Sequence, residues 1–441
     1  MNSKPKIIVL DDDPTGSQTV HSCLLLMQWD VETLRLGLAD ESPIFFVLTN
    51  TRALTPDKAA SITEEVCHNL KSAIAIEGIQ DFLVVSRSDS TLRGHYPIET
   101  DVIAQELGGF DAHFIIPAFF EGGRLTRDSI HYLIVDGVET PVHQTEFARD
   151  SVFSYHYSYL PDYVEEKTQG RIKASVVERF LLADIRQGTR DRLMALKDNQ
   201  CVVVDGETQA DFDRFAQDIL STAASGKRFL FRSAASILTS LAQLPSQPIA
   251  PEDMAQYKPT PKPGAVIVGS HVKKTTQQLE QLLQEPSTVG IEIDVVQLRD
   301  NPSQKEALTS QALQKVKEIH QAKKTPVVYT SRQELSFETV GQRLDFGIAV
   351  SSLLMDVVKG LPSDISFLIG KGGITSNDVL STGLNLRAAR LLGQILPGCS
   401  MVITPADHPL FPKLPVVLFP GNVGDVQGLA TVYRRLNQSI N

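Results

Sequence analysis

The sequence has few cysteines and lacks the common metal-ligand and nucleophile motifs. Only 4 cysteines occur in 441 residues, and none forms a CxxC pair. This spacing argues against disulfides and metal clusters and predicts reduced thiols in a cytoplasmic protein. The 10 histidines include no HExxH spacing, and no GxSxG sequence is present. We therefore expect neither zinc chemistry nor serine-hydrolase chemistry.

Long apolar runs and an excess of basic residues are also absent. The first apolar stretch ends at Leu10 and is followed by three aspartates, which predicts a β-strand rather than a signal peptide or a membrane span. The chain has 42 basic and 52 acidic residues, a formal net charge of -10. A phosphate backbone favours clustered basic residues, so we expect no nucleic-acid partner and no membrane partner. The sequence leaves the oligomeric state, including a homo-oligomer, open.

Short apolar runs alternate with helix-length amphipathic segments along the chain. In the first half the runs are 7–10, 44–48, 82–85 and 114–116. Segment 56–75 has helical spacing of its apolar residues, whereas 136–173 is irregular and rich in Tyr, His and Pro. The composition, 42% hydrophobic and 21% charged, is that of a globular protein. The alternation predicts an α/β fold with parallel sheets flanked by helices.

A proline-rich segment divides the chain into two predicted domains. Five prolines crowd residues 246–263, which contain few apolar residues. A second series of strand-like runs follows at 265–268, 291–295, 326–329, 367–369, 401–404 and 416–419. We therefore predict domains at 1–245 and 264–441 joined by a linker at 246–263, each domain with a mainly parallel sheet flanked by helices.

Three consecutive aspartates, Asp11, Asp12 and Asp13, follow the first predicted strand and precede a Pro-Thr-Gly sequence. Ligands bind at the carboxyl edge of parallel sheets, where a carboxylate can act as a general base or hold a metal. The plain alternative is a solvated acidic turn that caps the next helix. The pattern Asp-x-Asp-x-Thr also resembles the haloacid-dehalogenase phosphatases, in which Asp11 would be the nucleophile. That family needs a downstream acidic pair, and Asp425 has no second aspartate close by.

Arginines and hydroxyl groups follow three of the other predicted strands. One loop contains Asp89, Ser90 and Arg93; Arg52 and Arg124 lie in two further loops. A guanidinium group matches a carboxylate in a bidentate manner, whereas hydroxyls and Asp suit a polyol chain. These residues predict a pocket for a small acid, with loop-stabilising Arg-Asp pairs as the plain alternative.

Three glycine-containing loops follow strands in the second half. They are Gly269-Ser270, the segment 370–378 and the segment 419–425. Free backbone N–H groups at such turns bind anions, and Lys371 would add a positive charge. Neither GxxxxGK[ST] nor GxGxxG is present at these strands, so any nucleotide site must be of another type.

Six motifs, in this order and spacing, resemble the four-carbon acid sugar kinase family. They are Asp12-Asp13-Pro14-Thr15-Gly16, the segment 88–94, Pro117-Ala118 with Gly123-Arg124, Gly269-Ser270, Gly372-Gly373-Ile374-Thr375 and Pro420-Gly421-Asn422. The resemblance spans nearly the whole chain. It implies a sugar-acid-binding N-terminal domain, a nucleotide-binding C-terminal domain and an active site in the cleft between them. It also implies ATP-dependent phosphorylation of threonate, erythronate or 3-oxo-tetronate at the terminal hydroxyl.

The resemblance assigns roles to individual residues. Asp12 or Asp13 would accept or orient the hydroxyl proton. The expected substrate contacts are Arg52, Asp89, Ser90, Arg93 and Arg124. The expected ATP contacts are Ser270, Gly372, Gly373, Ile374, Thr375 and Gly421. For Mg²⁺ no ligand is assigned, and Asp378 and Asp425 are the candidates.

The sequence departs from the family pattern at two positions. Ser17 stands where the first motif commonly has Ala, and Ile374 stands where the glycine loop commonly has Asp. Loss of the loop acid could change how Mg²⁺ or the ribose is held. It also keeps open a protein that binds nucleotide and sugar acid without catalysis. The sequence does not determine which acid is the substrate, which stereoisomer it is or which of its carbons is phosphorylated.

Overall fold

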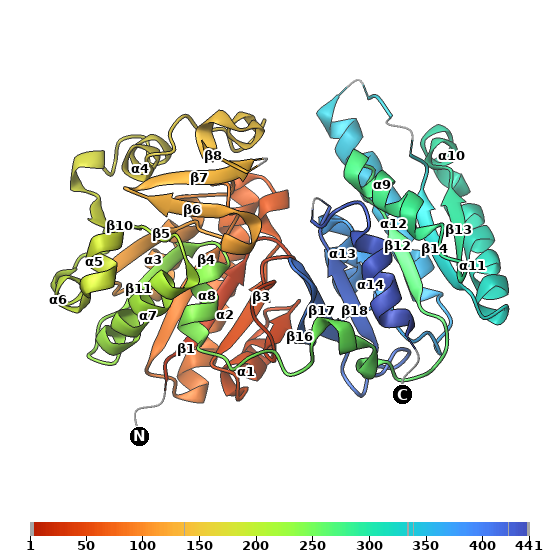
Figure 1. Ribbon diagram of the computed structural model, residues 1–441, viewed down its shortest axis with the longest axis horizontal. Helices are drawn as coiled ribbons and strands as arrows, with labels where there is room; N and C mark the ends of the chain where they lie inside the picture. Colours follow the sequence, from red (N-terminus) through yellow and green to blue (C-terminus); the bar gives the residue numbers. More distant parts are fainter. Residues whose placement is uncertain (1–3, 136, 333–334, 338, 422, 439–441) are drawn as a thin grey trace. The chain divides into compact units, whose positions relative to one another are not determined.

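The structure, a computed structural model, describes residues 4–135, 137–332, 335–337, 339–421 and 423–438. It divides into two compact units, Met1–Ser246 and Gln247–Asn441, called unit 1 and unit 2 below. Figure 1 shows unit 1 in red to green and unit 2 in green to blue. Each unit contains a mainly parallel sheet flanked by helices, which confirms the predicted α/β class.

The main sheet of unit 1 has the strand order β2-β3-β1-β4-β11-β5-β10-β9, with every neighbouring pair parallel. Its strands are β1 (Lys6–Asp11), β2 (Leu24–Leu26), β3 (Ile44–Leu48), β4 (Phe82–Arg87), β5 (Ala112–Ile116), β9 (Glu178–Phe180), β10 (Gln200–Val204) and β11 (Phe229–Ser233). The central strands are buried along their length, because helices cover both faces of a parallel sheet.

The helices of unit 1 begin and end at residues that favour helix termini. The longest, α2, starts after Thr55 with Pro56 in its first turn and ends at Gly78, whose φ is 66°. A capping box between Thr208 and Asp211 begins α7. The helices are α1 (Val31–Ala39), α2 (Pro56–Glu77), α3 (Ile98–Leu107), α4 (Leu160–Lys167), α5 (Leu182–Gln187), α6 (Arg190–Ala195), α7 (Gln209–Ala223) and α8 (Ser236–Ala242).

Unit 1 also contains a small antiparallel sheet of order β6-β7-β8 (Figure 1). Its strands are β6 (Arg124–Arg127), β7 (Ile130–Val135) and β8 (Val138–Pro141). The carboxylate of Asp205, which follows β10, accepts hydrogen bonds from the backbone N–H groups of Asp128 and Ser129 at 2.8 Å each. This contact attaches the β6-β7 turn to the main sheet. The sequence predicts irregular structure at 136–173, but β8 lies within this segment.

The sheet of unit 2 has the order β13-β14-β12-β15-β18-β17-β16. The neighbouring strands β13, β14, β12, β15 and β18 are parallel. β17 pairs antiparallel with both β18 and β16. The strands are β12 (Ala265–Val268), β13 (Thr288–Ile293), β14 (Thr325–Thr330), β15 (Leu368–Lys371), β16 (Ala388–Leu396), β17 (Cys399–Ile403) and β18 (Pro415–Phe419). The predicted strand 291–295 ends early, because Asp294 caps a helix that starts at Val295.

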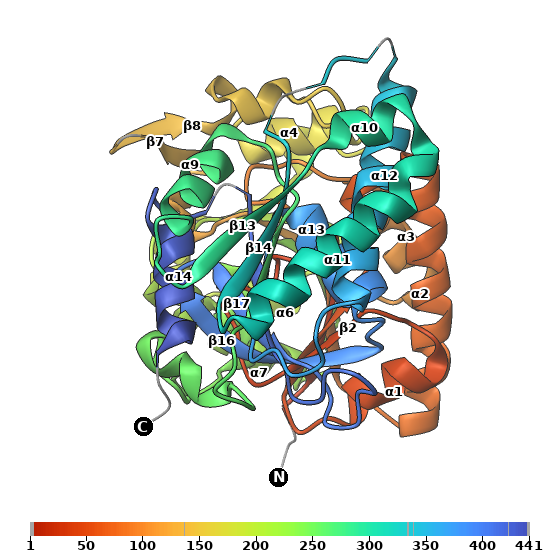
Figure 2. The ribbon, with the colours of Figure 1, turned by 90° about the vertical axis from the view of Figure 1, so that its right-hand side faces the viewer.

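Helices cover both faces of the unit 2 sheet. In Figure 2, α9 lies beside α14, and α11 lies beside α12 on the opposite face. The helices are α9 (Lys273–Leu282), α10 (Val295–Asp300), α11 (Lys305–Gln321), α12 (Val340–Lys359), α13 (Gly373–Asp378), the π-helical turn η8 (Val379–Gly383) and α14 (Gly428–Asn437). The short 3-10 helix η6 (Pro251–Tyr257) lies within the proline-rich segment, and its Met254 is fully buried in the core formed by α9 and α14.

In each unit the chain changes the side on which it adds strands. From β1 the chain adds β3 on one side and β4 on the other; from β12 it adds β14 on one side and β15 on the other. Ligands of open α/β sheets bind outside the carboxyl ends of the strands at such a point. The segments that leave these two points are Asp11–Asp13 and Gly269–Ser270. The topology therefore places both predicted ligand-binding segments at ligand-binding edges.

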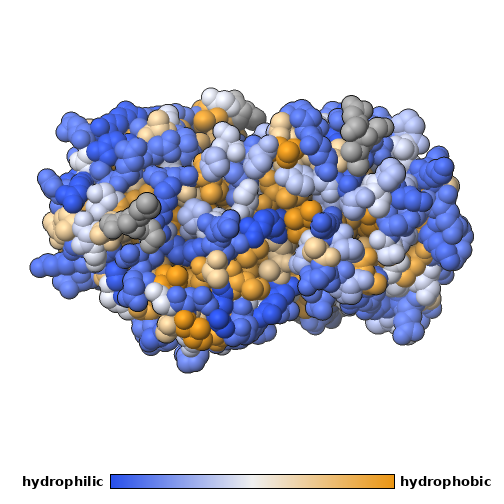
Figure 3. All heavy atoms as spheres, turned by 90° about the horizontal axis from the view of Figure 1, so that it is seen from below, coloured by the Kyte–Doolittle hydropathy of each residue, from blue (hydrophilic) through white to orange (hydrophobic). Residues whose placement is uncertain are grey.

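None of the described helices has the length and apolar character needed to cross a bilayer. The face seen in Figure 3 is mainly hydrophilic, with smaller apolar patches between the polar residues. Such a mixture is ordinary for a surface in contact with water.

Candidate functional site

Asp12 forms an ion pair with Arg52 through both carboxylate oxygens. Arg52 lies in the turn after β3, and its Nη2 and Nε donate to Asp12 Oδ1 and Oδ2 at 2.5 Å and 3.1 Å. The hydroxyl of Ser88 donates to the same Oδ2 at 2.6 Å. Asp12 is only 1% exposed. Asp12 therefore holds Arg52 through two hydrogen bonds and is almost inaccessible to a ligand.

Asp13 is the more accessible of the two predicted catalytic residues. Its side chain is 24% exposed. Oδ2 accepts from Arg52 Nη1 at 3.2 Å, and Oδ1 accepts from the backbone N–H of Thr15 at 2.8 Å and from its hydroxyl at 2.5 Å. Burial raises the pKa of Asp13, but Arg52, Arg87 and the Thr15 hydrogen bonds outweigh it, and the pKa lies below its usual value. Asp13 is therefore ionised throughout the neutral pH range.

Asp89 links Arg52 to Arg93. Its Oδ1 lies 3.9 Å from Arg52 Nη1, and its Oδ2 accepts from Arg93 Nε at 2.8 Å. Arg93 continues the series to Asp150, at 3.5 Å. Burial raises the pKa of Asp89, but the two arginines outweigh it and hold the pKa well below its usual range. The structure thus brings Asp13, Arg52, Asp89 and Arg93 into one chain of alternating charges.

Ser90 connects this loop to the small sheet. Its backbone carbonyl lies 2.8 Å from Nε2 of His131 on β7, and Nδ1 of His131 lies 3.0 Å from the hydroxyl of Thr126 on β6. Burial lowers the pKa of His131 to about 4, so the imidazole is neutral at neutral pH. These contacts place β6, the strand that begins with Arg124, against the Asp89–Arg93 loop.

Arg124 is half-buried and has no carboxylate partner among the described residues. Its Nη1 donates to the carbonyl of Gly122, and its Nε is buried with no partner among the described residues. In the same described ranges it forms no ion pair within 4.0 Å. Burial lowers the pKa of Arg124, Asp89 raises it and Arg93 lowers it further. Arg124 therefore lies within electrostatic reach of the Asp89–Arg93 pair with its charge uncompensated.

Sequence reasoning missed the buried network beneath these residues. Arg232 on β11 donates to Glu99 Oε2 at 2.5 Å, to Ser86 Oγ at 2.8 Å and to Ser88 Oγ at 2.7 Å. Ser88 in turn bonds Asp12. The available signal was Arg232 itself, because an arginine inside an apolar strand requires buried partners.

Asp11 is not placed for nucleophilic chemistry. It is 0% exposed, lies 3.3 Å from Arg87 Nη1, and its Oδ2 has no hydrogen-bond partner among the described residues. A Cβ on Gly16 would overlap this carboxylate, so the Pro-Thr-Gly turn packs directly over it. Burial raises the pKa of Asp11 to about 7, despite the opposing effect of Arg87.

This raised pKa predicts a pH-dependent cost in stability. The pKa of an unfolded aspartate is about 3.9, so the native state binds more protons than the unfolded state between pH 4 and pH 7. The free energy of unfolding of the wild type, relative to Asp11→Asn, should therefore fall as the pH rises through this window, by at most about 4 kcal/mol. Urea unfolding of both proteins at a series of pH values measures this difference. A difference that stays constant from pH 4 to pH 7 would contradict it.

The three glycine loops of unit 2 meet around Ser270. The hydroxyl of Thr275 donates to Ser270 Oγ at 3.2 Å and to the carbonyl of Gly421 at 3.3 Å. A Cβ on Gly372 would lie 3.1 Å from Ser270 Cβ, and one on Gly421 would lie 3.7 Å from Ser270 Oγ. Thr375 is buried in the same place, because a Cβ on Gly269 would overlap its hydroxyl. The strand ends of β12, β15 and β18 thus form one cluster of backbone groups.

The remaining residues predicted to contact ATP lie at the outer side of the Gly372 loop. An added Cβ on Gly373 would meet no atom within 4 Å. Ile374 is 66% exposed, so the position that commonly carries an acid is here an exposed apolar side chain. Asn422, which belongs to the third glycine motif, lies outside the described residues.

Lys371 does not supply a free positive charge to this loop. It is 0% exposed, and its Nζ donates to the carbonyls of Pro420 and Gly421 at 2.6 Å and 3.1 Å. The ammonium group also lies 4.1 Å from the ring centroid of Phe419. Burial lowers the pKa of Lys371 to about 7. The expected phosphate contact is therefore wrong for this conformation, in which Lys371 holds the Gly421 loop in place.

Arg332 is a second residue that sequence reasoning missed. It follows β14, the neighbour of β12, and its Nη2 donates to the carbonyl of Ser270 at 2.5 Å. The same Nη2 and Nε donate to the hydroxyl of Thr276 at 3.0 Å and 3.2 Å. Arg332 therefore ties the Ser270 loop to the start of α9. Its position two residues after an apolar strand was the available signal.

The two candidates for Mg²⁺ differ in their free oxygens. Both oxygens of Asp378 accept hydrogen bonds, from Ser351 Oγ and from Asn377 Nδ2. Asp425 is exposed, and its Oδ1 accepts from the backbone N–H of Gln427 at 3.0 Å, whereas its Oδ2 accepts no hydrogen bond from a described residue. The described residues contain no cluster of three His, Cys, Asp or Glu side chains that could hold a metal ion. A Mg²⁺ ion bound mainly through nucleotide phosphates needs only one or two carboxylates, which Asp425 fits.

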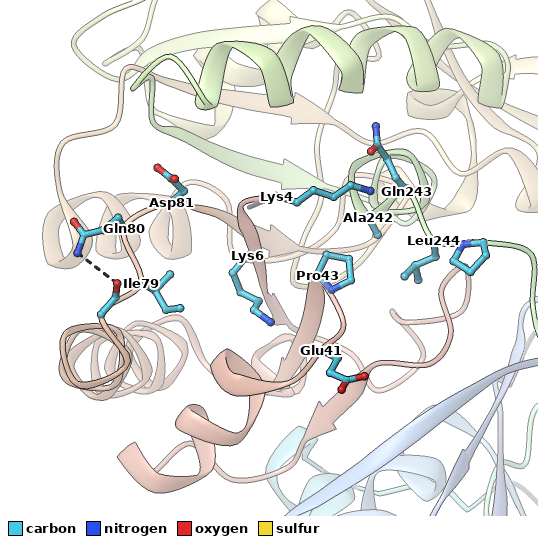
Figure 4. Close-up of a pocket in the computed structure, with 12 residues that line it drawn as sticks. Lys4, Lys6, Glu41, Pro43, Ile79, Gln80, Asp81, Ala242, Gln243 and Leu244 are labelled. Atoms are coloured by element: carbon cyan, nitrogen blue, oxygen red, sulfur yellow. Dashed lines mark hydrogen bonds between the residues drawn. The ribbon is translucent and has the colours of Figure 1, made fainter. Parts of the chain in front are cut away.

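A separate pocket of about 680 Å³ lies away from all these residues. Its lining includes Lys4, Lys6, Asp81 and Gln243 (Figure 4). These residues lie at the amino ends of β1 and β4 and after α8, the edge opposite to Asp11–Asp13. Nζ of Lys6 already donates to the carbonyls of Asp40 and Ser42. We therefore give more weight to the carboxyl edge, where ligands of parallel sheets bind.

Comparison with known proteins supports the separate roles of the two units. Residues 7–241 match a family model described as a sugar-binding N-terminal domain, and residues 265–429 match one described as a nucleotide-binding C-terminal domain. A D-erythronate kinase from Heliobacterium modesticaldum is 26% identical over 311 residues, 67% of this chain and 64% of that protein. A D-threonate kinase from Bordetella bronchiseptica is 28% identical over 166 residues, 36% of this chain and 38% of that protein. The matches thus span less than two thirds of either relative.

Solved structures share the fold over nearly the full length. A Salmonella typhimurium LT2 protein has a TM-score of 0.72 at 18% identity, with 98% of each chain covered. A Haemophilus influenzae protein has a TM-score of 0.65 at 16% identity, with 97% of this chain and all of that chain covered. At these identities the likeness shows the fold alone. Because the sugar-binding model alone matches more than half of the chain and the nucleotide-binding model follows it in order, the chain belongs to the four-carbon acid sugar kinase family.

Proposed function

We propose that this protein is an ATP-dependent kinase that phosphorylates the terminal hydroxyl of a four-carbon sugar acid of the threonate, erythronate or 3-oxo-tetronate type. The observation that carries the proposal is the uncompensated guanidinium of Arg124 beside the Asp89–Arg93 pair. A half-buried guanidinium group without a carboxylate partner favours an anionic ligand, and the neighbouring carboxylates suit its hydroxyl groups. The named D-erythronate and D-threonate kinases support the same class of acid.

In this proposal the acid lies along the chain of alternating charges. Arg124 binds the substrate carboxylate, since Arg52 and Arg93 are already neutralised by aspartates. Arg93 and Asp89 contact the middle hydroxyls. Asp13 accepts a hydrogen bond from the terminal hydroxyl and receives its proton as the phosphoryl group is transferred.

Unit 2 supplies the nucleotide site. The backbone N–H groups of Gly373, Ile374 and Gly421 contact the phosphates, because those of Gly372 and Ser270 already donate to the carbonyls of Phe419 and Lys371. Asp425 would hold Mg²⁺ together with the phosphates, and the ion would neutralise developing charge during transfer.

The burial of Asp11 argues against the phosphatase alternative. A nucleophilic aspartate must be ionised and must reach the phosphorus atom. Asp11 is fully buried, and its pKa is raised to about 7. The exposed Ile374 is the one feature that favours a protein that binds both ligands without catalysis.

A single assay separates the three functions. ADP release is measured with ATP, Mg²⁺ and a panel of four-carbon sugar acids, with a no-acid control and phosphomonoesters alongside. Acid-dependent ADP release supports the kinase and identifies the acid. Phosphate release from a phosphomonoester without ATP would instead support the phosphatase, and binding of both ligands without turnover would support the non-catalytic protein.

Arg124→Ala should raise the KM for the acid about 10- to 100-fold, because a charge-assisted contact to a carboxylate is lost. The KM for ATP should stay within about twofold, since the nucleotide loops are not altered. Arg124→Lys should retain part of the affinity through its charge.

Arg127→Ala is the matched control for this prediction. Arg127 lies on the same strand but is partly exposed and pairs with Glu139 and Glu207. Surface pairs of this kind contribute about 1 kcal/mol or less to stability, so the KM for the acid should not change. Equal values of this KM for Arg124→Ala and the wild type would remove Arg124 from the site.

A further inference from the structure

Arg332 combines an organised guanidinium group with one unused donor. Nη2 and Nε are fixed by the carbonyl of Ser270 and the hydroxyl of Thr276. Nη1 is buried and has no hydrogen-bond partner among the described residues. A buried donor without a partner is unfavourable unless a ligand or water completes it. The orientation of the Arg332 guanidinium group is therefore fixed by the protein, and its Nη1 remains available to donate to a ligand.

The charge of Arg332 is also uncompensated. In the part of the chain that the structure describes it forms no ion pair within 4.0 Å. Burial lowers its pKa, and Glu292 and Tyr329 only partly oppose this effect. The other arginines of unit 2 that show ion pairs, such as Arg299 and Arg434, have carboxylates at 2.8 Å. A half-buried guanidinium group without a carboxylate partner favours binding of an anionic ligand.

The fold places this group beside the glycine loops. β14 and β12 are parallel neighbours, so Arg332 and Ser270 leave the sheet at the same edge. We propose that Arg332 binds a phosphate oxygen of the nucleotide through Nη1 while its other nitrogens hold the Ser270 loop. This inference rests on the nucleotide role proposed for the glycine loops around Ser270. It adds a charged contact to a site whose other predicted contacts are neutral.

Binding of MgATP, MgADP, AMP and adenosine to the full-length protein tests this role. Arg332→Ala should weaken MgATP binding about 10- to 100-fold and adenosine binding less than about twofold. A residue that only supported the Ser270 loop would weaken MgATP binding equally in Arg332→Ala and Arg332→Lys, because neither variant keeps the fork that holds the loop. Arg332→Lys keeps the charge but not the fork, so its affinity for MgATP should lie between those of the wild type and Arg332→Ala.

Arg299→Ala is the control, because Arg299 pairs locally with Asp300 and lies on the partly exposed helix α10. If Arg332→Ala does not fold, the ratio of MgATP to adenosine affinity in Arg332→Lys decides. A ratio equal to that of the wild type, or equal losses for all four ligands, would contradict phosphate binding by Arg332. It would leave the proposed nucleotide site intact. Absence of nucleotide binding by the unaltered protein would overturn the nucleotide site itself, and this inference with it.

Discussion

Replacing Gly372 by alanine is expected to weaken nucleotide binding by at least about 100-fold. The φ and ψ of Gly372 are 123° and 145°, a region that is essentially restricted to glycine. An added Cβ would also lie 3.1 Å from Ser270 Cβ and 3.1 Å from Thr375 Oγ1. The loop must therefore move. Loss of two backbone donors to phosphates, at about 1.5–3 kcal/mol each, accounts for the expected factor.

Gly347→Ala is a matched control in the same unit but outside the glycine loops. Its added Cβ meets no atom within 4 Å, and the residue lies inside helix α12. Alanine favours helix formation, so this change should alter nucleotide affinity by less than about twofold. Both variants replace a glycine by alanine. They differ in the backbone conformation of the glycine and in the space around it.

Isothermal titration with MgATP measures both variants, and a thermal melt of each protein checks that it is folded. Sugar-acid binding should be unchanged in both, because neither position lies in unit 1. Wild-type affinity in Gly372→Ala would show that the loop tolerates displacement, and it would remove the Gly372 loop from the nucleotide site.

The sequence predicted the strand ends more successfully than the contacts made there. Apolar runs followed by Asp, Arg or Gly located the carboxyl ends of the central strands, because strand burial and the residues at strand ends are local properties of the sequence. β16 was missed, since Arg390, Gly393 and Gln394 interrupt its apolar pattern and its pairing with β17 contains register shifts. A bulged strand has no simple alternation in its sequence.

Which charges face a ligand and which are buried could not be predicted from local patterns. Asp11 and Asp12 are adjacent, but one is packed under the Pro-Thr-Gly turn and the other is fixed by Arg52, 40 residues away. Lys371 follows an apolar strand, as a phosphate-binding lysine would, but it donates to carbonyls 49 and 50 residues later. These outcomes depend on partners brought together only by the tertiary fold.

Asp13→Asn is expected to lower kcat about 10²- to 10⁴-fold, the usual contribution of a positioned general base. The KM for the acid should change by less than about threefold, because Arg124 and Arg93 still bind the substrate. The variant keeps the side-chain shape and can still accept a hydrogen bond from Thr15, so the loss should appear in turnover. Steady-state kinetics with the acid identified by ADP release measures both constants.

Asp12→Asn should behave differently, because Asp12 is buried and pairs with Arg52 through both oxygens. Removing its charge leaves Arg52 less well compensated, which should lower the free energy of unfolding by about 3 kcal/mol.

The pH dependence of kcat is a further test of Asp13. The pKa of Asp13 is held below its usual value, so wild-type kcat should not fall from loss of this base until the pH is below about 4. A weakly basic carboxylate is sufficient, since the proton leaves the hydroxyl late in a loose phosphoryl transfer. If Asp13→Asn kept more than half of the wild-type kcat, the proton of the acceptor hydroxyl would have to pass to another group. Asp13 would then serve only to orient Arg52.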